Sequence, residues 1–185
     1  VSIGEGPELS GFDKPFQSIL DVAEKPGDDF GQLLIDCCNS EVALDPRQRA
    51  DDVDAAVSAG ADAVGFVFAE SVRRVSPSQA VEACQGLPPG ILRVAVMKHP
   101  PQSQLDEVLE QFAPDVLQTD VGDFEVLRVP DSVERWPVFR QGVTEPGRQA
   151  TFLYEGRVSG SGTTVDWQLA RSHTLHGNMI LAGGL

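Results

Sequence analysis

The sequence predicts an α/β protein in which a parallel sheet is wrapped by helices, and three features carry this prediction. From about residue 31, short runs rich in β-branched residues alternate with amphipathic stretches. Several of the apolar runs show no alternation of polarity, as expected of strands buried on both faces. With 185 residues, 41% of them hydrophobic and 23% charged, the chain has enough apolar surface for one core.

The expected strands are the apolar runs of this pattern. Two alternatives stay open for the first strand, which is either the run 32–38 or the run 41–45. Short strands separated by helical stretches are typical of repeated β-α units. The remaining expected strands are, in chain order, 63–68, 92–97, 116–118, 137–140, 151–155 and 179–182.

Three helices have recognisable starts between these strands. A capping side chain satisfies unpaired backbone N–H groups of the first turn, whereas an early Pro has no N–H to satisfy. Gly60 and Gly86 stand where two of the helices should end. The expected starts and helices are Asp51-Asp52 before 53–59, Ser76-Pro77 before 78–84, and Ser103 before 104–112.

Two parts of the chain are less regular. The stretch 114–149 has little helical signal, and 142–147 predicts a loop. We separate an atypical N-terminal segment, residues 1–30, from an α/β domain, residues 31–185. Within the N-terminal segment we expect a strand at 1–4, a helix over 15–24 and a turn at Pro26-Gly27-Asp28.

Charge and cysteine content exclude several classes of partner. The formal net charge is −14 and no Lys/Arg cluster is longer than Arg73-Arg74, so a nucleic acid would be repelled. No stretch approaches the roughly 18 apolar residues of a membrane span. The three cysteines are an odd number without the paired spacing of a zinc site, so we expect a cytoplasmic protein. A small anionic ligand remains compatible, because backbone N–H groups bind phosphate without net positive charge.

Two glycine-rich loops follow the last two expected strands. Glu155 closes one strand and is followed by Gly160, Ser161 and Gly162, and the final strand runs into Gly183-Gly184. Without side chains, such a backbone can approach an anion closely. The glycines alone suit a plain loop equally well. In barrels of parallel strands, however, phosphate sites are frequently built by loops after the late strands.

Three segments in combination resemble a known enzyme family. They are 60–77 with its Gly-Phe-Val-Phe strand, the Ser-Gly-Ser-Gly loop with Val165-Asp166-Trp167, and the closing Leu-Ala-Gly-Gly-Leu. Over residues 42–185 the chain resembles phosphoribosylanthranilate isomerase of tryptophan biosynthesis. The resemblance implies a (β/α)8 TIM barrel that binds a small sugar phosphate. It also implies an Amadori rearrangement carried out by a general acid and a general base, with no metal or organic cofactor.

The resemblance also assigns residues to roles. The acid falls on Glu155, where the family has an Asp, and the base falls on Asp45 first or Cys37 second. Buried Cys37 and Cys38 would instead serve only as small apolar residues. Arg73 or Arg74 would bind the anthranilate carboxylate, which suits a planar guanidinium. The phosphate would be held by Gly160, Ser161, Gly162, Gly183 and Gly184.

Some features depart from the family pattern. Asp120 replaces a His, and His99, His173 and His176 are expected on the surface because they lack metal-ligand spacing. The family continues past Ala-Gly-Gly with an eighth strand, so we expect a barrel that is incomplete at its C-terminus or permuted. Residues 1–30 would then be the tail of a preceding indole-glycerol-phosphate synthase domain or a displaced eighth unit.

Two other functions are alternatives to the isomerase. A noncatalytic or inactive phosphate-binding barrel is favoured by the changed acid and base. An isomerase of the histidine-pathway sugar phosphate is less favoured, because Val165-Asp166-Trp167 and the Gly-Phe-Val-Phe strand match the tryptophan enzyme. The oligomeric state stays open.

Overall fold

The computed structural model describes residues 21–24, 32–35, 46–71, 73–158 and 165–182. Within them, eight strands form one sheet in sequence order. The strands are β1 (Asp21–Glu24), β2 (Gln32–Ile35), β3 (Ala61–Val67), β4 (Leu92–Val96), β5 (Val116–Asp120), β6 (Glu134–Arg140), β7 (Thr151–Glu155) and β8 (Asn178–Ala182). The helices are α1 (Pro46–Ser58), α2 (Pro77–Ala83), α3 (Gln102–Gln111) and α4 (Trp167–His173), with short 3-10 turns η2 (Val121–Glu125) and η3 (Thr174–His176).

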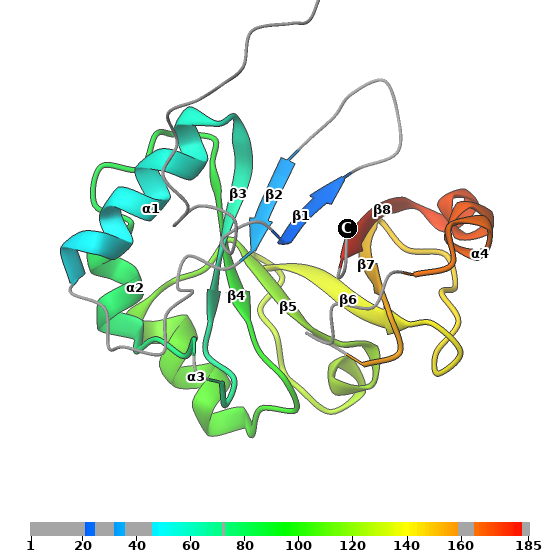
Figure 1. The fold of residues 1–185 in the computed structure, drawn as a ribbon. Coiled ribbons are helices and arrows are strands. Elements are labelled where there is room, and N and C mark those ends of the chain that lie inside the picture. Colours follow the sequence, from blue (N-terminus) through cyan, green and yellow to red (C-terminus); the bar gives the residue numbers. More distant parts are fainter. Residues whose placement is uncertain (1–20, 25–31, 36–45, 72, 159–164, 183–185) are drawn as a thin grey trace, which may run out of the picture.

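The strands from β2 to β8 all run parallel, and only β1 is antiparallel to its neighbour β2. The sheet curves so that β1 also lies beside β8, and α1, α2 and α3 cover one outer flank while α4 covers the other (Figure 1). Parallel strands need crossover connections, which the helices supply here. The predicted α/β barrel is therefore confirmed over seven parallel strands of the described chain.

The start of the barrel corrects several expectations. Of the two alternatives for the first strand, 32–35 forms β2, whereas 41–45 lies outside the described residues. The expected helix over 15–24 is wrong for 21–24, which pair with β2 as a strand because tertiary pairing overrides local propensity. The expected strand at 1–4 and turn at 26–28 lie outside the described residues.

Of the three expected helix starts, the one at Ser76-Pro77 is confirmed and the other two are corrected. Ser76 caps α2 as expected: its hydroxyl accepts a bond from the Gln79 N–H, and the Gln79 side chain accepts one from the Ser76 N–H. The expected start of α1 at Asp51-Asp52 is wrong, because α1 already begins at Pro46. Proline needs no N–H partner in the first turn, so it starts the helix as well as a capping acid does. For the same reason α3 follows Pro101 rather than starting at Ser103.

Side chains on the strands alternate between an inner and an outer layer. The inner layer contains Ala63, Val94, Val116, Trp136, Val138, Leu153 and Ile180. In the outer layer, Phe66 and Phe68 of the β3 region pack against Phe112 with ring centroids 5.3 and 5.4 Å apart. Because the period of a strand is two, residues two positions beyond an inner side chain also face inward. This rule decides which residues reach the mouth of the barrel.

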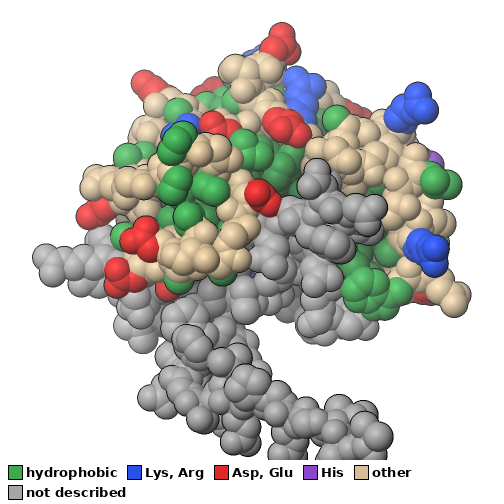
Figure 2. All heavy atoms as spheres, turned by 90° about the horizontal axis from the view of Figure 1, so that it is seen from above, with side chains coloured by type: hydrophobic (Ala, Val, Ile, Leu, Met, Phe, Trp, Pro, Cys, Tyr) green, Lys and Arg blue, Asp and Glu red, His purple; other side chains and the backbone are tan. Residues whose placement is uncertain are grey.

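On the described part of the face in Figure 2, the Lys and Arg side chains stand apart from one another and form no continuous patch. None of the described helices is long and apolar enough to cross a membrane.

A salt bridge ties β4 to β5 at their amino ends. The Arg93 Nε lies 3.0 Å from the Asp115 Oδ2, which also accepts the Arg93 backbone N–H at 2.8 Å. Burial by itself raises the pKa of Asp115, but the hydrogen bonds and charge of Arg93 outweigh it and leave that pKa below its ordinary value. The pair therefore stabilises the fold only while Asp115 is ionised.

We expect Asp115→Asn to lower the free energy of unfolding at pH 7 by about 0.2–1 kcal/mol, a range that already allows for solvent screening of this partly exposed pair. A carboxyl with a lowered folded-state pKa stabilises above its unfolded pKa and stops doing so as the pH falls through the folded value. The difference between variant and wild type in urea denaturation should accordingly start to shrink as the pH falls toward about 4, the ordinary pKa of an Asp, and should vanish only below the lowered folded-state pKa of Asp115. A difference that persists in acid would contradict this account.

Gly177 occupies a position where no side chain fits. A Cβ there would lie 2.1 Å from the Gln149 carbonyl oxygen, a backbone atom that cannot move aside. We expect Gly177→Ala to cost about 1–3 kcal/mol of stability, the range of overpacking. Gly147→Ala is the matched control, since a Cβ at Gly147 would meet nothing within 4 Å. Equal melting temperatures for the two variants would refute the close approach.

Candidate active site at the carboxyl ends of the strands

Charged side chains gather where adjacent parallel strands end. Asp120, Arg140 and Glu155 are the last residues of β5, β6 and β7, and each lies two positions beyond a residue on the inner side of its strand. Val138 and Leu153 are those inner residues for Arg140 and Glu155. The strand period therefore aims the three charged side chains into one mouth of the barrel.

Arg140 joins the two carboxylates. Its Nε lies 2.8 Å from the Glu155 Oε1, and its Nη1 donates to the Asp120 Oδ1. The side chains of Arg140, Glu155 and Asp120 are only 19%, 15% and 10% exposed. Ion pairs this shielded from water interact more strongly than surface pairs do.

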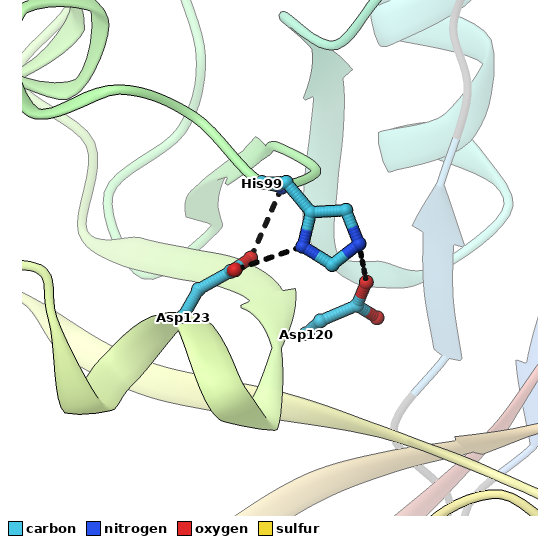
Figure 3. Close-up of side chains that lie close together, drawn as sticks. All are labelled: His99, Asp120 and Asp123. Atoms are coloured by element: carbon cyan, nitrogen blue, oxygen red, sulfur yellow. Dashed lines mark hydrogen bonds and ion pairs between the residues drawn. The ribbon is translucent and has the colours of Figure 1, made fainter.

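His99 extends the network toward β4. Figure 3 shows its ring between two carboxylates, with Nε2 at 3.0 Å from the Asp120 Oδ2 and Nδ1 at 2.9 Å from the Asp123 Oδ1. The backbone N–H of His99 donates to the other oxygen of Asp123 at 3.1 Å, and the Thr119 hydroxyl donates to that same oxygen. We call His99, Asp120, Asp123, Arg140 and Glu155 the mouth network.

The donor set of His99, Asp120 and Asp123 resembles that of a metal centre, because one ligand atom from each lies within 4.8 Å of the others. Arg140 already binds Asp120, however, and a guanidinium repels a cation. Thr119 and the His99 N–H occupy Asp123. Among the described residues these three therefore form a network in which each carboxylate already accepts hydrogen bonds from protein donors.

The end of the glycine-rich stretch is held by β6. The Asp166 N–H donates to the Gln141 Oε1 at 2.9 Å, and the Asp166 carboxylate caps α4 by accepting from the Gln168 and Leu169 N–H groups. Gln141 is the neighbour of Arg140. The carboxyl end of β6 thus contacts both Glu155 and the entry to α4.

The structure locates only some of the predicted site residues. Glu155 belongs to the mouth network. Arg73 is partly buried, and Arg74 is exposed and lines a pocket with Ser76, Gln104 and Glu107 between α2 and α3. Arg74 is thus turned toward the helices and is not part of the mouth network. Outside the described residues lie Asp45, Cys37, Cys38, Gly160, Ser161, Gly162, Gly183 and Gly184.

Sequence reasoning missed three members of the network, namely His99, Asp123 and Arg140. His99 has an exposed side chain but is bound by two carboxylates, which lie more than twenty residues away in sequence. Arg140 was not singled out, although it ends an expected strand as Glu155 does. The expectation that His173 lies on the surface is wrong: it is 6% exposed and packs on Tyr154 with ring centroids 4.8 Å apart.

Comparison with known proteins gives this geometry a context. Residues 42–185 match the family model of N-(5'phosphoribosyl)anthranilate (PRA) isomerase. The N-(5'-phosphoribosyl)anthranilate isomerase of Desulforamulus reducens is 34% identical over 141 residues, which cover 71% of this chain and 68% of the relative. That of Streptococcus gordonii is 34% identical over 150 residues, covering 79% and 76%.

Solved structures agree. The phosphoribosyl anthranilate isomerase from Thermus thermophilus is 25% identical, with a TM-score of 0.60 over 74% of this chain and 72% of that one. A second isomerase structure, in complex with reduced 1-(o-carboxyphenylamino)-1-deoxyribulose 5-phosphate, shares the fold at 20% identity and a TM-score of 0.61, covering 82% and 74%. With the family model, the relatives and the barrel in agreement, this chain belongs to the N-(5'-phosphoribosyl)anthranilate isomerase family.

Proposed function

We propose that this chain carries out the Amadori rearrangement of N-(5'-phosphoribosyl)anthranilate to 1-(2-carboxyphenylamino)-1-deoxyribulose 5-phosphate with Glu155 as the general acid. The family's reaction belongs to tryptophan biosynthesis, and by family the chain is an isomerase. The position of Glu155 carries the proposal, because it ends β7 on the inner side at the mouth of the barrel. Catalytic residues of such barrels sit at the carboxyl ends of strands.

In this reaction the acid protonates the ribose ring oxygen, and the C1–O bond of the ring opens to a protonated Schiff base. A base then removes the C2 proton to give an enolamine, which becomes the aminoketone product by gaining a proton at C1 and losing the proton of its C2 hydroxyl. Glu155 donates the first proton from its protonated form, in which its ion pair with Arg140 is replaced by a neutral hydrogen bond. Only 15% of its side chain is exposed, so bulk water has limited access to the proton transfer.

For the base we retain Asp45 first and Cys37 second. Both follow β2 in sequence, and β2 runs parallel to β3 and to the rest of the barrel. The chain therefore leaves β2 at the edge of the sheet where Glu155 stands, which supports a base on this segment. Asp45 and Cys37 themselves lie outside the described residues.

The substrate phosphate is assigned to the two glycine-rich loops, Gly160–Ser161–Gly162 and Gly183–Gly184. Support comes from what flanks them. The described chain stops at Ala182, the last residue of β8, which pairs with Glu155 across the sheet. Glu155 and Ala182, the last residues of the strands that precede these two segments in sequence, thus lie beside each other. We further propose a cytoplasmic location, because the three cysteines of the sequence are an odd number and do not suggest a framework of disulfides.

Replacing Glu155 by Gln should lower kcat by about 100-fold to 10,000-fold, because the amide keeps the shape but cannot transfer the proton. Glu155→Asp, which retains a carboxyl, should recover part of that loss. Substrate is generated in situ and its fluorescence loss is followed. Glu110→Gln, a change at an exposed carboxylate on α3, is the control and should match wild type.

If Glu155→Gln turns over like wild type, the assigned acid is wrong. If wild type itself does not turn over but binds the substrate analogue, the chain is the noncatalytic phosphate-binding barrel instead.

Activity should survive dialysis against EDTA, because proton transfer by two side chains needs no metal and the carboxylates of the mouth network are already paired. The same assay measures kcat before and after dialysis. A loss that added Zn²⁺ or Mg²⁺ restores would show that His99, Asp120 and Asp123 hold a functional ion.

A further inference from the structure

We propose that Arg140 is a positioning residue for the acid, and that Asp120 in turn holds Arg140. The inference rests on the proposed role of Glu155 and deepens it. Arg140 acts through Glu155 rather than on the substrate, so it is distinct from the residues that transfer protons.

The register of β6 and β7 places Arg140 next to Glu155. Arg140 and Glu155 are direct partners across β6 and β7, so their side chains leave the sheet side by side. Asp120 is the partner of Val138 across β5 and β6, which places it one diagonal step from Arg140. A diagonal separation of about 7–8 Å is within reach of a long side chain such as Arg.

The charges on three adjacent strands alternate in sign. Asp120 on β5 and Glu155 on β7 flank Arg140 on β6, and each accepts from a different nitrogen of the guanidinium. That planar group fixes both distance and direction, which an ammonium on a flexible stem does not. Without Arg140, two largely buried carboxylates would face each other across the strand between them.

Asp120 is itself fixed from its far side. Its second oxygen binds the His99 Nε2 at 3.0 Å, and the other ring nitrogen of His99 is bound by Asp123. Starting from Glu155, the series of contacts therefore runs through Arg140 of β6 and Asp120 of β5. It continues through His99, which follows β4, to Asp123 of η2.

The main chain supports the same arrangement. The Arg140 N–H donates to the Thr144 hydroxyl at 2.9 Å, and the Gln141 N–H donates to the Glu155 carbonyl at 3.0 Å. Main-chain hydrogen bonds thus fix the backbone at both Arg140 and Glu155, in addition to the contact between their side chains.

A fixed carboxyl matters because a glutamate side chain has several rotatable bonds, and an acid displaced by 1 Å can lose about 100-fold in rate. Holding Glu155 by Arg140 removes that freedom before substrate arrives. The contribution should appear in the chemical step, since the ground-state contacts of the substrate are unchanged.

The test compares Arg140→Met with Arg140→Lys. We expect Arg140→Met to lower kcat by about 10-fold to 100-fold with KM within about 2-fold of wild type. Arg140→Lys should restore part of kcat.

Arg93→Met is the matched control. It removes an arginine from an Arg–Asp pair of similar geometry, 3.0 Å from Nε to Oδ2, at the amino ends of the strands. It should reduce stability while leaving kcat and KM as in wild type. If Arg140→Met fails to fold by near-ultraviolet circular dichroism, Asp120→Asn provides the second variant, with a smaller fall in kcat expected.

Three results would overturn the inference. Unchanged kcat in both Arg140→Met and Asp120→Asn would show that the network does not position the acid. A rise in KM alone would make Arg140 a substrate-binding residue. A wild-type chain without turnover would remove the proposed function as well, whereas turnover lost in Glu155→Gln but kept in Arg140→Met would overturn only this inference.

Discussion

Parallel pairing of β2 to β8 in sequence order is the constraint on which the rest of the structure depends. It brings all their carboxyl ends to one edge, and the period of two then decides which end residues face the centre. Val138 and Leu153 fill the inner layer, so Arg140 and Glu155 must follow on the same side. A shift of one residue in either strand would turn these charges outward and replace them by Phe139 or Tyr154.

This constraint also explains how acidic groups are tolerated at a shielded mouth. A chain with a net charge of −14 places Asp120, Asp123 and Glu155 within one connected network, where repulsion would otherwise dominate. Arg140 and His99 separate them, so each carboxylate has a donor. Burying a charge is costly unless it is paired, and breaking such a pair costs more than the pair contributes. Loss of Arg140 would therefore leave Asp120 and Glu155 as largely buried carboxylates without the cation that lies between them.

Short sequence motifs correctly predicted helix ends that are fixed by residues close in sequence. The capping box at Ser76 and Gln79 is one example, and the glycine stops at Gly60 and Gly86, both with positive φ, are another. Where a signal had a competitor, the prediction failed. Helix α1 begins at Pro46 and not at the acidic pair Asp51-Asp52. Residues 21–24, which were expected to be helical, form β1 because they pair with β2.

By itself the sequence determined the α/β class, most of the strands, the family resemblance and the placement of Glu155 at a strand end. Those features depend on composition, periodicity and short motifs, which are local or recur in fixed order. Only the tertiary structure decided that Arg140 lies between Asp120 and Glu155, and that His99 binds two carboxylates. These contacts join residues 15 to 24 positions apart, and the register of parallel strands, which no local pattern encodes, brings them together.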